Sequence, residues 1–184
     1  MSDLKESPSQ TAGPYVHIGC APQTAGLEQR SMGPQLGMDM ITNGPDVQGI
    51  TLDITVLDGA GDLVNDALIE IWQATPDGQF VATNTFANWG RQASDLQTGS
   101  AVFRTFKPGA PQGQAPHILV WIVARGINLG LITRIYFPDE ENVNDAVLAL
   151  AADRAASLIA TKTDTGYAHV IRLQGPQETV FFDV

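Results

Sequence analysis

The feature that most constrains this chain is a succession of short strand-like segments separated by turns. From Ile50 to Val56, apolar residues alternate with polar ones, the period-2 pattern of a strand with one buried face. Comparable runs follow, divided by Gly- and Pro-containing turns, over residues 67–72, 101–106, 118–124, 131–137, 167–173 and 179–184. Seven or more short strands predict a mainly β protein, an antiparallel β-sandwich with an extended N-terminal arm and one or two short helices.

Two parts of the chain depart from the strand pattern. Residues 1–47 are rich in Gly, Pro, Gln and Met without sustained periodicity, which is typical of an extended arm. We therefore divide the chain into this arm and a β-sandwich domain over residues 48–184. Residues 139–160 have a helical pattern that begins with three acidic residues, and we expect a second short helix to start at Asp153.

The composition limits the partners of the chain. Ten Lys and Arg stand against 20 Asp and Glu, a net charge of −10 without any basic stripe, which argues against nucleic-acid binding. Charged residues make up 16%, below the roughly 25% usual in soluble domains, so we expect part of the surface, the arm included, to lie against another subunit. No apolar run is long enough for a signal peptide or a membrane span, which predicts a cytoplasmic protein.

The residues alone reveal no activity. The three histidines, His17, His117 and His169, do not stand at metal-ligand spacing, and the single Cys20 excludes an internal disulfide and a cysteine zinc site. Neighbouring carboxylates fall in turns and at the expected helix start, where solvated caps explain them. The chain contains neither a nucleophile elbow nor a phosphate-binding loop motif.

Several motifs together resemble the intradiol ring-cleavage dioxygenases, in order and over nearly the whole chain. They are Pro8-Ser9-Gln10-Thr11-Ala12-Gly13-Pro14-Tyr15, Ala67-x-Ile69-Glu70-Ile71-Trp72-Gln73-Ala74, Phe103-Arg104-Thr105-x-Lys107-Pro108-Gly109, Thr133-Arg134-Ile135-Tyr136-Phe137 and Glu178-Thr179-Val180-Phe181-Phe182-Asp183. The resemblance implies a β-sandwich enzyme in which non-haem ferric iron, held by two tyrosinates and two histidines, opens catechol rings.

The expected iron ligands are largely missing from this chain. The family's first tyrosine follows a Gly-Arg pair, where this chain has Gln92. The second lies in the loop over residues 110–116, which contains none here. The two histidines of the family's His-x-His pair correspond to positions 117 and 119, where this chain has His117 and Leu119. The resemblance therefore implies that these are vestigial ligand positions, that this chain binds no metal, and that Fe3+ belongs to a homologous beta subunit.

In the heteromeric members of the family, the arm and one arginine of the alpha chain approach the beta chain's active site. Carried over to this sequence, the substrate-binding residues are Arg134 and, on the arm, Thr11, Gly13, Pro14 and Tyr15. The substrate that this implies is 3,4-dihydroxybenzoate, whose carboxylate a cation would orient. The resemblance also implies a higher alpha–beta oligomer.

Other interpretations stay open at this point. The chain would be a self-sufficient catechol-type dioxygenase if other residues held iron, or a non-enzymatic β-sandwich binding or scaffold module if it had lost any link to catalysis. Arg134, taken alone, would be an ordinary ion-paired strand residue, and Tyr15 an anchor at a subunit interface. The three tryptophans are expected to serve core and interface packing.

Overall fold

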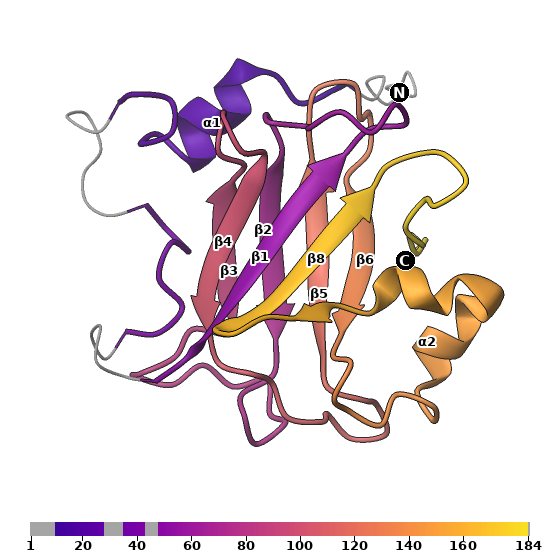
Figure 1. The fold of residues 1–184 in the computed structure, drawn as a ribbon. Coiled ribbons are helices and arrows are strands. Elements are labelled where there is room, and N and C mark those ends of the chain that lie inside the picture. Colours follow the sequence, from indigo (N-terminus) through magenta and orange to yellow (C-terminus); the bar gives the residue numbers. More distant parts are fainter. Residues whose placement is uncertain (1–9, 28–34, 43–47, 184) are drawn as a thin grey trace, which may run out of the picture.

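The computed structural model describes residues 10–27, 35–42 and 48–183 and places two four-stranded sheets face to face (Figure 1). The first sheet has the strand order β4 (Ser100–Thr105), β1 (Ile50–Leu57), β8 (Gly166–Arg172) and β7 (Thr161–Lys162). The second has the order β3 (Trp89–Ala93), β2 (Leu68–Gln73), β5 (His117–Val123) and β6 (Leu131–Tyr136). Neighbouring strands are antiparallel except β1 and β8, which are parallel. The predicted β-sandwich is confirmed, with this one parallel pair as a departure.

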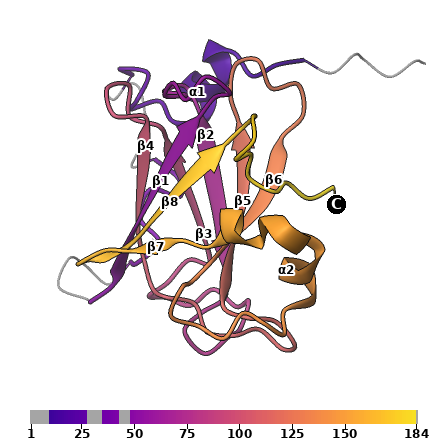
Figure 2. The ribbon, with the colours of Figure 1, turned by 45° about the vertical axis from the view of Figure 1, so that its right-hand side comes forward.

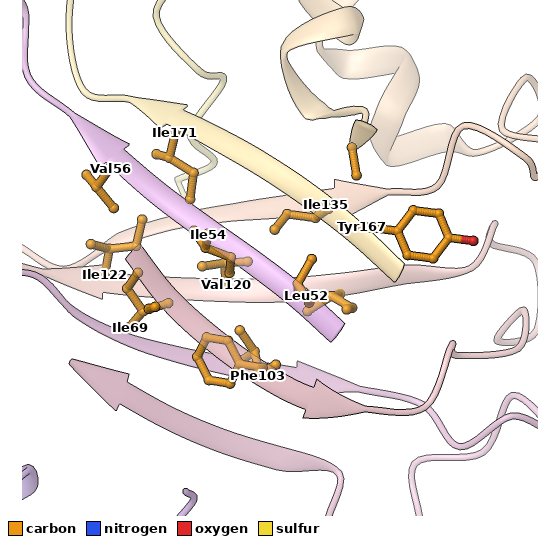
Figure 3. Close-up of a cluster of buried hydrophobic side chains, with 14 of the residues drawn as sticks. Leu52, Ile54, Val56, Ile69, Phe103, Val120, Ile122, Ile135, Tyr167 and Ile171 are labelled. Atoms are coloured by element: carbon orange, nitrogen blue, oxygen red, sulfur yellow. The ribbon is translucent and has the colours of Figure 1, made fainter. Parts of the chain in front are cut away.

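The apolar core lies between the sheets, where the alternating strand pattern places it (Figure 3). Leu52, Ile54 and Val56 of β1 are fully buried, whereas the residues between them are partly exposed. The second sheet contributes fully buried apolar side chains from β2, β5 and β6, namely Ile69, Val120, Ile122 and Ile135. Since burial of one large aliphatic side chain contributes about 1.5–3 kcal/mol, this layer is the main source of stability.

The segment over residues 35–42 packs against the edge of the second sheet. Its Met40 and Ile41 are buried in the same core, although they fall within the arm as the sequence delimits it. A side chain at Gly90 of β3 would place its Cβ 2.8 Å from the Met40 sulfur, so glycine is required for this close approach. This part of the arm is therefore integrated into the sandwich.

The helices differ from those that the sequence predicts. Helix α1 (Pro14–Cys20) lies in the arm, where we expected extended chain. The start predicted for the helix over residues 139–160 is wrong, because α2 (Ala146–Leu150) begins only after its cap residue, Asp145. The 3-10 helix η2 (Ala152–Leu158) follows directly, close to the expected start at Asp153, and both lie beside β6 (Figure 2). No helix in the described part of the chain combines the length and apolarity needed to cross a membrane.

The strand predicted over residues 179–184 is also wrong. The backbone N–H of Thr179 donates to Arg172 in the first sheet, and that of Phe182 donates to Ile132 in the second. The segment therefore bridges the two sheets and does not extend a ladder, and the side-chain hydroxyls of Thr179 and Thr133 add one further hydrogen bond to each sheet. Its apolar content has another cause, because Val180 is buried at the sandwich edge next to the equally buried Thr179.

The acidic cluster that we expected to cap a helix has another role. Asp139 accepts hydrogen bonds from Lys107, Lys162 and the hydroxyl of Tyr167. Burial opposes its ionisation, but these donors outweigh it and hold the pKa of this carboxyl well below its usual value. Lys107 also pairs with Glu140 at 2.5 Å. This cluster ties β7 and β8 to the loop after β6, so the expectation of solvated caps was wrong here.

The buried histidine of β8 gives the fold a pH dependence. His169 is 5% exposed, and burial lowers its pKa to about 4, against a hydrogen bond with the backbone of Ile159. Because the unfolded chain takes up a proton near pH 6.5 and the folded chain does not, stability is complete above that pH and falls as the pH drops toward 4. We expect a loss of about 2 kcal/mol between pH 8 and pH 5, since each unit of pKa shift corresponds to about 1.4 kcal/mol.

Urea unfolding of the wild type and of His169→Leu at both pH values measures this contribution. The variant should lose clearly less stability on acidification than the wild type. An equal fall in both proteins would show that other groups cause it.

Candidate functional site

Arg134 lies on the outer face of the second sheet. Its neighbours along β6, Thr133 and Ile135, are fully buried, so alternation turns Arg134 away from the core. It stands in register with Leu119 of β5, one of the positions that the resemblance relates to an iron ligand. The guanidinium is thus part of a sheet surface that another chain could cover.

The guanidinium of Arg134 is held by neutral groups. Its Nη1 donates to Oε1 of Gln114 at 2.7 Å and to the hydroxyl oxygen of Tyr136 at 3.4 Å. Among the described residues, no carboxylate forms an ion pair with it. The ordinary explanation of a strand arginine, an ion pair within the chain, is therefore not what the structure shows.

A buried carboxylate fixes the surroundings of this arginine. Asp145 is 2% exposed and accepts the hydroxyl of Tyr136 at 3.0 Å and the backbone N–H of Ala115 at 2.9 Å. It also caps α2 by accepting the N–H groups of Val147 and Leu148. Burial opposes its ionisation, but these donors together hold the pKa of Asp145 below its usual value.

His117 is tied into the same region. It is 5% exposed, its Nδ1 donates to the carbonyl of Ala115 at 2.9 Å, and its ring lies 5.8 Å from that of Tyr136. Burial lowers its pKa, and the charge of Arg134 acts in the same direction. Burial likewise raises the pKa of Tyr136 to about 12. Both rings are therefore neutral at physiological pH.

These side chains do not fit a ferric ion. Hard ferric iron requires several anionic oxygen or imidazole donors, but the register partner of Arg134 is the apolar Leu119, and the phenol of Tyr136 stays protonated on Asp145. Within the described residues, no three His, Cys, Asp or Glu side chains gather closely enough to hold a metal.

Gln92 is not brought together with His117 and Leu119. It lies on the edge strand β3, in register with Ile69, which in turn pairs with Ile122 of β5. Along β5, Ile122 is five residues from His117, so Gln92 lies far from that histidine. The side-chain amide of Gln92 instead donates to the carbonyl of Met38. The three positions named as vestigial ligands therefore do not line one site.

The arm is docked at the far end of β5. Gly126 donates its N–H to Oγ1 of Thr11 at 2.6 Å, and this hydroxyl donates to the carbonyl of Ala124 at 3.3 Å. Gly13 and Pro14 then start α1, with Gly13 as the N-cap residue in extended conformation. Tyr15, which follows, is 84% exposed, so the described residues of this chain leave it uncovered.

The arm and Arg134 lie apart on the same sheet. Arg134 is in register with Leu119, and Thr11 contacts Ala124, five residues further along the chain. At about 3.3 Å per residue, positions 119 and 124 are about 17 Å apart along the strand direction, and this separates the arm from Arg134. A cavity of about 400 Å³, lined by Thr11, Trp121 and others, marks where the arm crosses this face. Within one chain the five predicted substrate-binding residues therefore form two groups.

Two residues around Arg134 were not predicted from the sequence: Gln114, which accepts from its guanidinium, and Asp145, which accepts from Tyr136. Gln114 lies in an irregular loop 20 residues from Arg134, and no local pattern connects the two. Asp145 had a signal, since a cap residue followed by apolar residues is a common helix start. The stronger acidic run at 139–141 obscured it.

The fold is similar to that of solved intradiol dioxygenases. An intradiol ring-cleavage dioxygenase from Tetranychus urticae aligns with a TM-score of 0.52 and 18% identity over 73% of this chain and 85% of its own. No family model matches the sequence. The architecture is thus that of the class which the sequence motifs suggested.

Two curated relatives identify the branch of this class. Both are protocatechuate 3,4-dioxygenase alpha chains. That of Pseudomonas putida is 40% identical, over 98% of this chain and 97% of its own, and that of Burkholderia cepacia is 36% identical over the full length of both. The chain therefore belongs to the protocatechuate 3,4-dioxygenase alpha-chain family, as a subunit of an intradiol dioxygenase. This confirms the resemblance stated from the sequence.

The attachment of the arm can be tested at Thr11. Thr11→Val removes the acceptor of the Gly126 N–H and the donor to Ala124, while Thr11→Ser keeps both. Since a hydrogen bond contributes about 1 kcal/mol, exchange of the Gly126 amide should become about fivefold faster in Thr11→Val only. Hydrogen-exchange mass spectrometry over residues 10–20 and 124–130 measures this. Unchanged exchange would show that other contacts hold the arm.

Proposed function

We propose that this chain is the non-iron alpha subunit of a heteromeric protocatechuate 3,4-dioxygenase and completes the substrate site of an iron-bearing beta subunit. The assembled enzyme cleaves 3,4-dihydroxybenzoate between its two hydroxyl-bearing carbons. Both atoms of O2 enter the product, 3-carboxy-cis,cis-muconate. The proposal includes a higher alpha–beta oligomer and a cytoplasmic location.

The observation that carries the proposal is the unneutralised charge of Arg134. In a chain of net charge −10, a half-buried guanidinium held by an amide and a phenol is suited to an external anion. The carboxylate of protocatechuate is such an anion, and arginine binds carboxylates with two parallel hydrogen bonds. The role of this chain is then to select and orient a carboxylated catechol.

The remaining parts of the proposal concern the partner. The side chains around His117 do not fit ferric iron, which supports Fe3+ in the beta subunit, where it would supply the oxygen chemistry. The exposed Tyr15 and its neighbours Thr11, Gly13 and Pro14 are suited to reach across an interface toward that subunit. This division of labour also accounts for the low charged fraction of the chain.

The first experiment measures bound iron and protocatechuate-dependent oxygen uptake. The chain alone should be colourless and inactive, and co-expression with the iron-bearing subunit should give a coloured, active complex. Iron and turnover in the chain alone would instead establish a self-sufficient dioxygenase. Failure to bind any iron-bearing homologue would favour a non-enzymatic scaffold.

The second experiment replaces Arg134 in the assembled enzyme. Arg134→Ala should raise KM for protocatechuate by about tenfold or more, because a charge-assisted hydrogen bond contributes about 1.5–3 kcal/mol. The iron content should not change. Arg154→Ala, which removes the same charge from helix η2, where Arg154 pairs with Glu178, is the matched control. Unaltered kinetics in Arg134→Ala would exclude the substrate contact.

A further inference from the structure

The two hydrogen bonds of Arg134 leave from the same nitrogen. Both the bond to Gln114 and the bond to Tyr136 use Nη1. Within the described part of the chain, Nε and Nη2 have no hydrogen-bond partner, so one edge of the guanidinium is free. A guanidinium edge that carries two parallel N–H groups matches the two oxygens of a carboxylate.

The neutrality of Gln114 distinguishes Arg134 from two other cations of the chain. Arg91 lies 2.6 Å from Glu70, and Lys162 lies 3.0 Å from Asp139, so each is neutralised by a carboxylate within the chain. At Arg134, an amide oxygen takes the place that a carboxylate takes elsewhere. The amide orients the guanidinium without lowering its affinity for an external anion.

We propose that Gln114 is a specificity-determining positioning residue, which holds Arg134 with a neutral acceptor so that the Nε–Nη2 edge binds the substrate carboxylate side-on. The inference rests on the proposed function of Arg134 and extends it to a residue that the resemblance does not name. Gln114 acts through Arg134 and does not itself touch the substrate.

Backbone hydrogen bonds hold the loop that carries Gln114 in place. The N–H of Gln114 donates to the carbonyl of Pro111 at 3.0 Å, and the next residue, Ala115, donates to Asp145. The same carboxylate receives the hydroxyl of Tyr136, the second neighbour of Nη1. One buried group therefore fixes both acceptors that orient the guanidinium.

The test is the substitution Gln114→Glu in the assembled enzyme. A carboxylate at this position would form an ion pair with Arg134 and compete with the substrate. We expect KM for protocatechuate to rise by about tenfold, while kcat changes less than about twofold. The inhibition constant of 4-methylcatechol, which lacks the carboxylate, should stay the same. Gln114→Leu, which removes the acceptor without adding charge, should raise KM by about threefold.

The control is Gln112→Glu, which adds the same charge at an exposed position of the same loop. Iron content and the size of the complex establish that each variant assembles. An increase in KM equal to that of Gln112→Glu, or an equal weakening of 4-methylcatechol, would overturn the inference. If Arg134→Ala raises KM and neither Gln114 variant does, the positioning role fails and the proposed function stands. If Arg134→Ala has no effect, the substrate contact of Arg134 fails, and the positioning role of Gln114 fails with it.

Discussion

Alternate side chains of β1, β4, β5 and β8 are buried between the two sheets, and this burial determines where the chain can meet other molecules. Ile118, Val120 and Ile122 of β5 are all fully buried, as is Ile135 of β6. A polar group that meets a substrate must therefore lie on the outer face of a sheet, in a loop or on the arm. Arg134 and Thr11 satisfy this requirement in two different ways.

The proposed selectivity of the outer face depends on its electrostatic setting. A protein with a net charge of −10 repels carboxylates over most of its surface, so a carboxylated substrate needs a local cation that is not already neutralised. Lys107 does not serve, because Asp139 and Glu140 both contact it. Arg134 is not neutralised in this way, because its hydrogen-bond partners among the described residues are an amide and a neutral phenol. Burial keeps that phenol protonated, so it adds no competing charge.

The sequence predicted most of the strands because their burial alternates. β5 and β6 were placed within one residue of their true bounds. β3 was missed because it lies at a sheet edge, where Gly90 replaces a large apolar residue to admit Met40. Segment 179–184 is as apolar as a strand, yet its hydrogen bonds go to two different sheets. Apolar content therefore indicates burial, and whether a ladder forms depends on which chain segments lie alongside.

The site was less predictable because its parts are joined by register and by long-range contacts. Arg134 and the arm could be named only through the resemblance, and the structure adds what holds them. The pairing of Leu119 with Arg134 illustrates this. An apolar side chain at that position cannot ligate iron, and it cannot neutralise a guanidinium either. The apolar side chain that supplies no metal ligand at this position thus also leaves the guanidinium without a competing anion, and the proposed role of the chain requires both properties.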